Sequence, residues 1–442
     1  MHRLPLARTV AGLIGLAAAG LVFIQLLVLP ALEAPGFDLV PLAAAGRLVT
    51  TDRAAHLYDH DPHHYNRTNS AAFDAAVREV GFDFGSTPFV YPPLVATAMQ
   101  PVSQLPFPVF MWWWTVGSAV GVTVILGLTL KLYLPAALNL PAFAAAILAL
   151  CFFEPVRYGL WLGQTTTAIF VLVLSALALQ RRRQFAAAGL LLAMAAFVKL
   201  TPSVLALLWL WRGPRRAFAW FAGSSAGLWG ISIGTLGLEV HLEYLARIRE
   251  IGGTVLVAYN NHSLLAFLTR RDVGGDAVRY WQQHASSAGD QAILLLFVGF
   301  LLVTTLILVG RIPLEFNEGW RALSEGFAFL AILLVPSISW THYFVMLLPV
   351  MAVILAHGPA VSRNLAYAMS AVVFLLCSTW LMPDQVAFDP SSRRLVGGPT
   401  VAALLATAVL CWLTWRLRGM QDSLRRHDLN PQPGCAQLNT SR

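Results

Sequence analysis

The sequence predicts an all-α integral membrane protein, a polytopic bundle of about 12 transmembrane helices with a long first extracytoplasmic loop. Of its 442 residues, 57% are hydrophobic and 12% are charged, whereas soluble domains carry about 25% charged residues. Apolar runs of about 20 residues, long enough to cross ~30 Å of hydrocarbon, recur along almost the whole chain. These observations exclude an ordinary soluble domain.

The N-terminal half begins with the apolar run from Val10 to Leu29, which follows a basic start and has the length of a retained transmembrane helix. The segment 31–90 is polar and too long for a simple connector, so we expect a folded outer loop. Two stretches within it, DLVPLAAAGRLV and NSAAFDAAVREVGF, show helical periodicity. Further spans are expected at 107–131, 136–153 and 165–180.

The segment 185–211 would form one long helix, but basic residues flank both of its ends, and basic links stay cytoplasmic. We therefore expect a helical hairpin that breaks at Leu200-Thr201-Pro202, because the residue before a proline disfavours helix. Lys199 would then lie deep, near the outer face. Non-helical backbone at that depth requires protein or a water-filled cavity around it, so the break also indicates a site.

The remaining spans are expected at 216–238, 291–310, 321–336, 343–358, 364–382 and 398–415, with a second outer loop at 239–290. The net charge of +8 follows this topology, since short basic links fall on one side of the predicted membrane. They contain Arg181–Arg183, Arg212, Arg215, Arg216, Arg311, Arg363, Arg416 and Arg418. This distribution predicts cytoplasmic N- and C-termini and gives no support to nucleic-acid binding.

Ionisable residues near the membrane are costly enough to indicate function. Asp38 follows the first span, Arg157 lies in the short link EPVRYGLWLGQ, Lys199 lies at the tip of the hairpin and His342 follows the span 321–336. The predicted topology brings all four to the outer leaflet. We expect a cavity there, covered by the two outer loops.

A series of short motifs, each weak alone, resembles the ordered signatures of glycosyltransferase family 87, in the GT-C class of polytopic transferases. They are Asp38, Leu57-Tyr58-Asp59, Tyr91-Pro92-Pro93, Gly163-Gln164, Lys199-Leu200-Thr201-Pro202, Asn261-His262-Ser263 and Pro336–Tyr343. The resemblance implies inverting, metal-independent transfer of a sugar from a polyprenyl-phosphate donor to an extracytoplasmic lipid or glycan acceptor. The sugar in that family is typically mannose or arabinofuranose, and we expect mannose here. It implies no cofactor beyond that donor, and a plasma (inner) membrane location.

The resemblance also implies roles for individual residues. Asp38 or His342 would be the catalytic base, and Lys199 and Arg157 would bind the donor phosphate. Substrate-binding residues would be Tyr91, Gln164, Asn261, Ser263, Trp340 and Tyr343. Residues 1–240 would form the GT-C catalytic module, 241–418 a C-terminal transmembrane module and 419–442 a disordered cytoplasmic tail.

Structural alternatives exist for four of the candidates. Asp38 could cap the helix that begins near Val40, Lys199 could extend to an interface, and Arg157 could pair with Glu154. His342 could be a structural histidine at a helix end. A transporter or flippase of a lipid-linked saccharide would need similar charges, although the chain lacks the repeated halves that are typical of many transporters.

Overall fold

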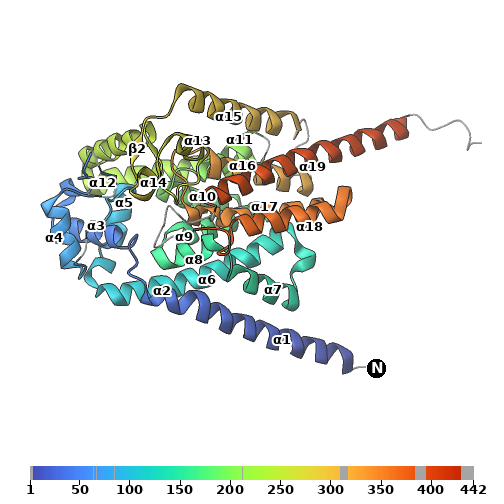
Figure 1. The fold of residues 1–442 in the computed structure, drawn as a ribbon, viewed down its shortest axis with the longest axis horizontal. Coiled ribbons are helices and arrows are strands. Elements are labelled where there is room, and N and C mark those ends of the chain that lie inside the picture. The colour runs from blue at the N-terminus through green and yellow to red at the C-terminus, as the bar shows by residue number, and fades with distance from the viewer. Residues whose placement is uncertain are drawn as a thin grey trace, which may run out of the picture.

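The computed structural model describes residues 3–62, 64–65, 67–83, 85–211, 213–308, 317–383 and 395–429. Within these ranges the chain is helical almost throughout, and the long helices lie side by side with similar axes (Figure 1). One small sheet is present there, in which β1 (Val255–Leu256) pairs antiparallel with β2 (Gln283–His284). The prediction of an all-α fold is confirmed.

Five helical segments of the described chain are long and apolar enough to cross a membrane: Thr9–Glu33, Phe107–Tyr133, Ala288–Thr305, Pro359–Leu376 and Gly398–Met420. The first runs through α1 (Arg3–Phe23), a π-helical turn (Ile24–Val28) and α2 (Leu29–Glu33), and the others belong to α6 (Phe107–Tyr133), α15 (Ala288–Leu308), α18 (Pro359–Leu376) and α19 (Gly398–Leu429). Each coincides with a predicted span. The expected total of about 12 spans stays a prediction.

Shorter helices fill the space between these segments. They are α7 (Leu140–Leu150), α8 (Glu154–Leu162), α9 (Thr166–Arg181), α10 (Phe185–Val198), α11 (Ser203–Trp211), α16 (Glu318–Leu334) and α17 (Leu347–His357). Helix α8 occupies the segment that we expected to be a simple link. Pro155 lies in its first turn, where a missing N–H costs no hydrogen bond, and Gly163 ends it with a φ of 71°.

The predicted hairpin is present. Helix α10 ends at Val198 and α11 begins at Ser203, so the break falls at 199–202. The chain then returns in α12 (Arg215–Gly253), which runs parallel to α10, with Gly189 beside Trp220 and Phe197 beside Trp229. A Cβ atom on Gly189 would lie 2.6 Å from the backbone nitrogen of Phe221, so this glycine permits the close packing.

Contacts between helix ends define one end of the bundle. Arg181, the last residue of α9, pairs with Glu325 at 2.7 Å and approaches Glu318, the first residue of α16, at 3.7 Å. Gly319 packs against His357, the last residue of α17. The N-terminus of α1 lies toward the same end (Figure 1). Two basic residues of the predicted cytoplasmic links, Arg212 and Arg311, lie outside the described residues.

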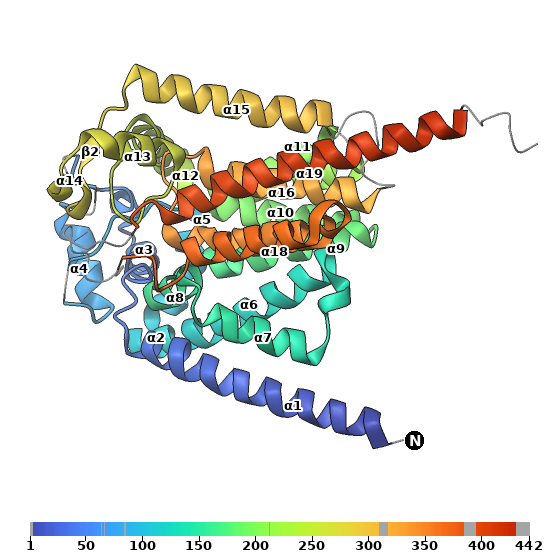
Figure 2. The ribbon, with the colours of Figure 1, turned by 45° about the vertical axis from the view of Figure 1, so that its right-hand side comes forward.

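The opposite end carries a group of short elements, here called the cap (Figure 2). It comprises α3 (Val40–Thr50), α4 (Ala71–Glu79), α5 (Pro93–Met99), α13 (Leu264–Thr269), α14 (Gly275–Arg279), the two strands and the last turns of α12. Helices α3 and α4 coincide with the two periodic stretches predicted within 31–90. Helix α12 enters the cap through a break at Gly237, where φ is 79°.

The cap has its own hydrophobic cluster, which fixes the segment before α3. Leu42, Phe73, Phe89 and Phe110 belong to this cluster. Helix α3 packs so closely on α5 that a Cβ atom on Gly46 would lie 2.5 Å from the carbonyl oxygen of Met99.

At the other end of the sequence, α19 extends to Leu429, and residues 430–442 of the expected tail lie outside the described residues.

Candidate active site

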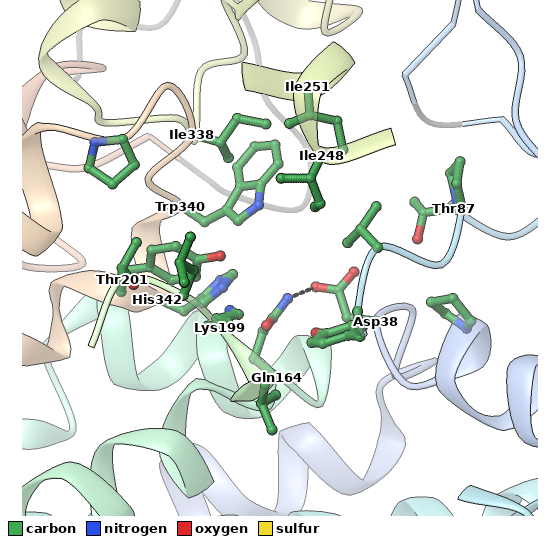
Figure 3. A pocket seen from close by; sticks show the side chains of 18 of the residues that line it. Asp38, Thr87, Gln164, Lys199, Thr201, Ile248, Ile251, Ile338, Trp340 and His342 are labelled. Atoms are coloured by element: carbon green, nitrogen blue, oxygen red, sulfur yellow. Dashed lines mark hydrogen bonds between the residues drawn. The ribbon is translucent and has the colours of Figure 1, made fainter. Parts of the chain in front are cut away.

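A cavity of about 930 Å³ lies between the cap and the helical bundle. Its lining combines side chains from segments far apart in the sequence, and several of them point toward one another (Figure 3). The polar and aromatic part of the lining includes Asp38, Tyr65, Tyr91, Tyr158, Gln164, Lys199, Asn260, Trp281, Trp340, His342 and Tyr343. Seven of our ten candidates are therefore in one cavity: Asp38, Tyr91, Gln164, Lys199, Trp340, His342 and Tyr343.

Asp38 is held against the C-terminal end of α8. Its backbone N–H donates to the carbonyl of Leu162 at 3.1 Å, and the side-chain amide of Gln164 donates to its carboxylate (Figure 3). Glycine is required at position 163 for two reasons. Its φ is positive, and a Cβ atom there would lie 2.6 Å from the side chain of Leu39. The capping alternative is not observed, since the N-cap of α3 is Leu39 and no side chain caps it.

The environment of Asp38 gives its carboxylate the properties of a base. Burial raises its pKa from 3.8 to about 6, while the hydrogen bond from Gln164 and the charge of Lys199 act in the opposite direction. A carboxylate with a pKa near the working pH is ionised at neutrality yet still accepts a proton readily. Asp38 can therefore act as a general base on a group that enters the cavity.

Lys199 places an ammonium group in the same cavity. Its Nζ donates to the hydroxyl of Thr166 at 3.1 Å and lies 3.9 Å from the centroid of the Tyr343 ring. No carboxylate within the described ranges forms an ion pair with it. The side chain thus points inward and does not extend to an interface, and its charge is available to an anionic ligand.

His342 lies at the start of the 3₁₀ helix Thr341–Met346. Its ring lies between Tyr343 and Tyr158, with centroid separations of 4.8 and 6.5 Å. Both ring nitrogens are buried and have no hydrogen-bond partner among the described residues. An unsatisfied buried polar group costs about 1–3 kcal/mol, so a bound substrate that satisfies either nitrogen would gain affinity.

Asn261 and Ser263 support the segment that carries His342. Asn261 donates to the carbonyls of Leu256 and Ser337 at 2.8 and 3.0 Å, and its side-chain oxygen accepts from the N–H of Ser339 at 2.8 Å. Ser263 donates to the carbonyl of Ser337 at 3.0 Å and caps α13. Both residues are fully buried and neither lines the cavity. They hold the segment 336–343 in position.

Arg157 is not brought to the cavity. Its guanidinium forms two hydrogen bonds with the buried carboxylate of Glu154, at 2.8 and 3.0 Å. The alternative that we stated for Arg157, pairing with the residue three positions earlier, is therefore what the structure contains. Helix α8 explains this pairing, because residues three apart on a helix are neighbours.

Several lining residues were absent from our candidates. Asn260 donates to the hydroxyl of Tyr158 at 3.1 Å, and Tyr65, Tyr259 and Trp281 come from the loops of the cap. Aromatic residues inside polar loops are the signal that could have identified the last three. In the described chain, no three His, Cys, Asp or Glu side chains come together in a group that could hold a metal ion.

An apolar part of the cavity faces the bundle. Phe197 of α10, Leu200 of the hairpin tip and Phe221 and Trp229 of α12 line it. The side chain of Leu200 is 72% exposed although the residue sits beside Lys199. A long hydrocarbon could therefore lie along this part while a polar head group reaches Lys199.

Comparisons with known proteins give two matches, one to a family model and one to a curated protein. The family model for glycosyltransferase family 87 matches residues 89–337, which is more than half of the chain. A "Polyprenol-phosphate-mannose-dependent alpha-(1-2)-phosphatidylinositol pentamannoside mannosyltransferase" from Mycolicibacterium smegmatis is 28% identical over 360 residues, covering 75% of this chain and 78% of that protein. No solved structure matches the chain significantly. The family match includes Gln164 and Lys199 but neither Asp38 nor His342, whose roles therefore rest on geometry.

Proposed function

Because the chain belongs to glycosyltransferase family 87 and is a membrane glycosyltransferase, we propose that it transfers mannose from a polyprenyl-phosphate donor to an extracytoplasmic lipid or glycan acceptor. The mannosyltransferase relative uses a polyprenol-phosphate-mannose donor according to its name. The observation that carries the proposal is the presence in one cavity of a carboxylate, Asp38, an ammonium group, Lys199, and an apolar groove. The comparisons do not favour the transporter alternative.

The position of the cavity along the bundle supports an extracytoplasmic site. Thr166, which contacts Lys199, begins α9, and Arg181 ends it. These 16 residues span ~24 Å at 1.5 Å per residue, which is most of the hydrocarbon thickness. The end marked by Arg181 is basic and would be cytoplasmic by the positive-inside rule. The cavity would then open near the outer surface of the inner membrane.

In the proposed reaction, the polyprenyl chain lies along Leu200, Phe221 and Trp229, and the donor phosphate meets Lys199. Asp38 takes the proton of an acceptor hydroxyl, whose oxygen bonds to the anomeric carbon of mannose. The bond from that carbon to the phosphate oxygen breaks, and the phosphate leaves with the electron pair. Attack opposite to the leaving group inverts the anomeric configuration. His342 would donate a hydrogen bond to the donor phosphate.

Lys199 would stabilise the charge that develops on the leaving phosphate. A preorganised charge or donor at such a position is commonly worth about 10²- to 10³-fold in rate. Since a fixed ammonium group can supply this stabilisation, we propose that transfer is independent of a metal ion. Transfer that survives prolonged treatment with EDTA would support this, and restoration of EDTA-abolished transfer by a divalent cation would contradict it.

The experiment that tests the proposal measures transfer by the purified protein in lipid nanodiscs from polyprenyl-phosphate [¹⁴C]mannose to extracted envelope lipids. Asp38→Asn is compared with the wild type, and Asp83→Asn, an exposed carboxylate of the same loop, is the matched control. We expect a loss of at least about 10²-fold in Asp38→Asn only. Wild-type transfer that is unchanged in Asp38→Asn would exclude this residue as the base.

A further inference from the structure

Four aromatic rings form one wall of the cavity, here called the aromatic wall: Tyr65, Tyr259, Trp281 and Trp340. Trp340 lies 5.2 Å from Trp281 and 6.3 Å from Tyr65 between ring centroids, and Trp281 lies 6.5 Å from Tyr259. The rings come from three separate segments, the first loop, the second loop and the segment that carries His342. Trp340 is seen near His342 and Lys199 in Figure 3. The aromatic wall is therefore next to the proposed reaction centre.

The backbone of Trp281 adopts an unusual conformation. Its φ is 56°, in the left-handed region that non-glycine residues rarely occupy. Hydrogen bonds fix the chain beside it, because the N–H of Gln282 donates to Ala277 and the carbonyl of Gln282 accepts from Val257, both at 3.1 Å. A strained conformation that the surroundings enforce is typical of positions where the side-chain direction matters.

A second cavity of about 740 Å³ borders Trp281. Among the described residues, its lining includes Pro62, His64, Arg67, Arg279, Tyr280, Trp281, Gln282 and Gln283. Trp281 is the single residue, among those described, that lines both cavities. Apart from Pro62, every one of these residues has a side chain with hydrogen-bonding groups, and two of them carry guanidinium groups. The described lining of the second cavity is thus polar, and it shares Trp281 with the active-site cavity.

This combination matches the chemistry of a saccharide. A sugar ring packs its C–H faces on an aromatic ring, while its hydroxyl groups need donors and acceptors around its edge. The phosphate and hydrocarbon of the donor have partners at Lys199 and in the apolar groove, and its single mannose must lie at the reaction centre between Asp38 and Lys199. The donor therefore has no further sugar that could occupy the second cavity. The acceptor is the other substrate that could place sugars in the second cavity. Its reacting hydroxyl must lie near Asp38.

We propose that the second cavity is a saccharide subsite for the acceptor, reached from the active site across Trp281. The acceptor then carries at least two sugar residues, of which the terminal one lies against the aromatic wall and the preceding one enters the second cavity. This inference rests on the proposed function, because it deepens the description of the acceptor. It assigns to Trp281 the role of selecting acceptors by glycan length.

The test compares three acceptors that share one tail, octyl mannoside, octyl mannobioside and octyl mannotrioside, with polyprenyl-phosphate mannose as donor. We expect the wild-type KM to fall by about 5- to 10-fold from the mannoside to the mannobioside, a ratio that corresponds to one sugar–aromatic contact. Trp281→Gly should abolish this difference without changing the KM for the donor. A preference that persists in Trp281→Gly, or a wild type without any preference, would overturn the proposal.

The variants are chosen so that unfolding does not confuse the result. Glycine adopts a φ of 56° without strain, so Trp281→Gly should keep the local backbone, and Trp281→Phe keeps an aromatic ring and most of the preference. Trp380→Gly is the matched control, because Trp380 is 56% exposed and stacks on Phe152 outside both cavities. It should leave the preference for the mannobioside unchanged.

A binding measurement separates failure of the subsite from failure of the proposed function. Calorimetric titration with mannotriose requires no donor and no transfer. Trp281-dependent binding by a protein that transfers no mannose would retain the subsite and remove the donor assignment. Normal transfer to all three octyl acceptors, with mannotriose binding unaffected in Trp281→Gly, would retain the function and remove the subsite.

Discussion

The raised pKa of Asp38 predicts that Asp38→Asn makes the protein more stable while it abolishes transfer. A buried carboxylate that must ionise destabilises the folded protein at neutral pH, because the charge loses part of its hydration. Asparagine has nearly the same shape and carries no charge. Its side-chain oxygen can still accept the hydrogen bond that the amide of Gln164 now donates to Asp38.

The magnitude follows from the pKa of Asp38. Its rise from 3.8 to about 6 corresponds to about 3 kcal/mol, which is an upper value because the side chain keeps partial contact with the cavity. The sign is fixed by linkage: the folded protein binds this proton more tightly than the unfolded chain does. The wild type therefore loses stability as pH rises from about 4 to about 6 and keeps this deficit above that range.

The assay is thermal unfolding in detergent, followed by tryptophan fluorescence between pH 5 and 7.5. Asp38→Asn should raise Tm by about 3 °C at pH 7.5, and by less at pH 5, where the wild-type carboxyl group is largely protonated. Asp83→Asn should show no such dependence. If Asp38→Asn lowered Tm by the same amount at every pH, Asp38 would be a structural anchor and the reasoning on its charge would be wrong.

Further predictions concern catalysis and the support of the site. The kcat/KM of transfer should increase as pH rises through about 6, because the carboxylate of Asp38 deprotonates there, and a profile that is flat from pH 5 to 7 would contradict this. Lys199→Met should lower kcat by about 10²- to 10³-fold, whereas Lys199→Arg should retain part of it. Asn261→Ala should destabilise the protein by roughly 2–4 kcal/mol, since it leaves the carbonyl of Ser337 and the buried N–H of Ser339 with fewer partners. Equal denaturation midpoints of variant and wild type would refute this role.

Features that depend on neighbouring residues in the chain could be predicted from the sequence. The break at 199–202 follows from Pro202 and the flanking basic residues, and the helical periodicity of α3 and α4 is visible in their sequences. Topology alone also brought Asp38, Lys199 and His342 to one place, because each follows or precedes a predicted span on the same side.

Other features depend on packing that the sequence does not display. Arg157 was predicted to reach the phosphate because its segment was taken as a link, but α8 directs it to Glu154. Asn261 was predicted to contact the substrate, whereas its amide satisfies backbone groups of the segment 336–343. Trp281 lies two residues before β2, whose pairing with β1 involves strands of only two residues each that no periodicity reveals.

The most direct test of sugar transfer at Asp38 counts both products of the reaction in one nanodisc sample. We expect one molecule of polyprenyl phosphate to be released for each mannose that appears on the acceptor, with both products lost together in Asp38→Asn. Donor that is consumed or moved with no mannosylated acceptor, or release of polyprenyl phosphate that continues unchanged in Asp38→Asn, would contradict a transferase that uses Asp38 as its base.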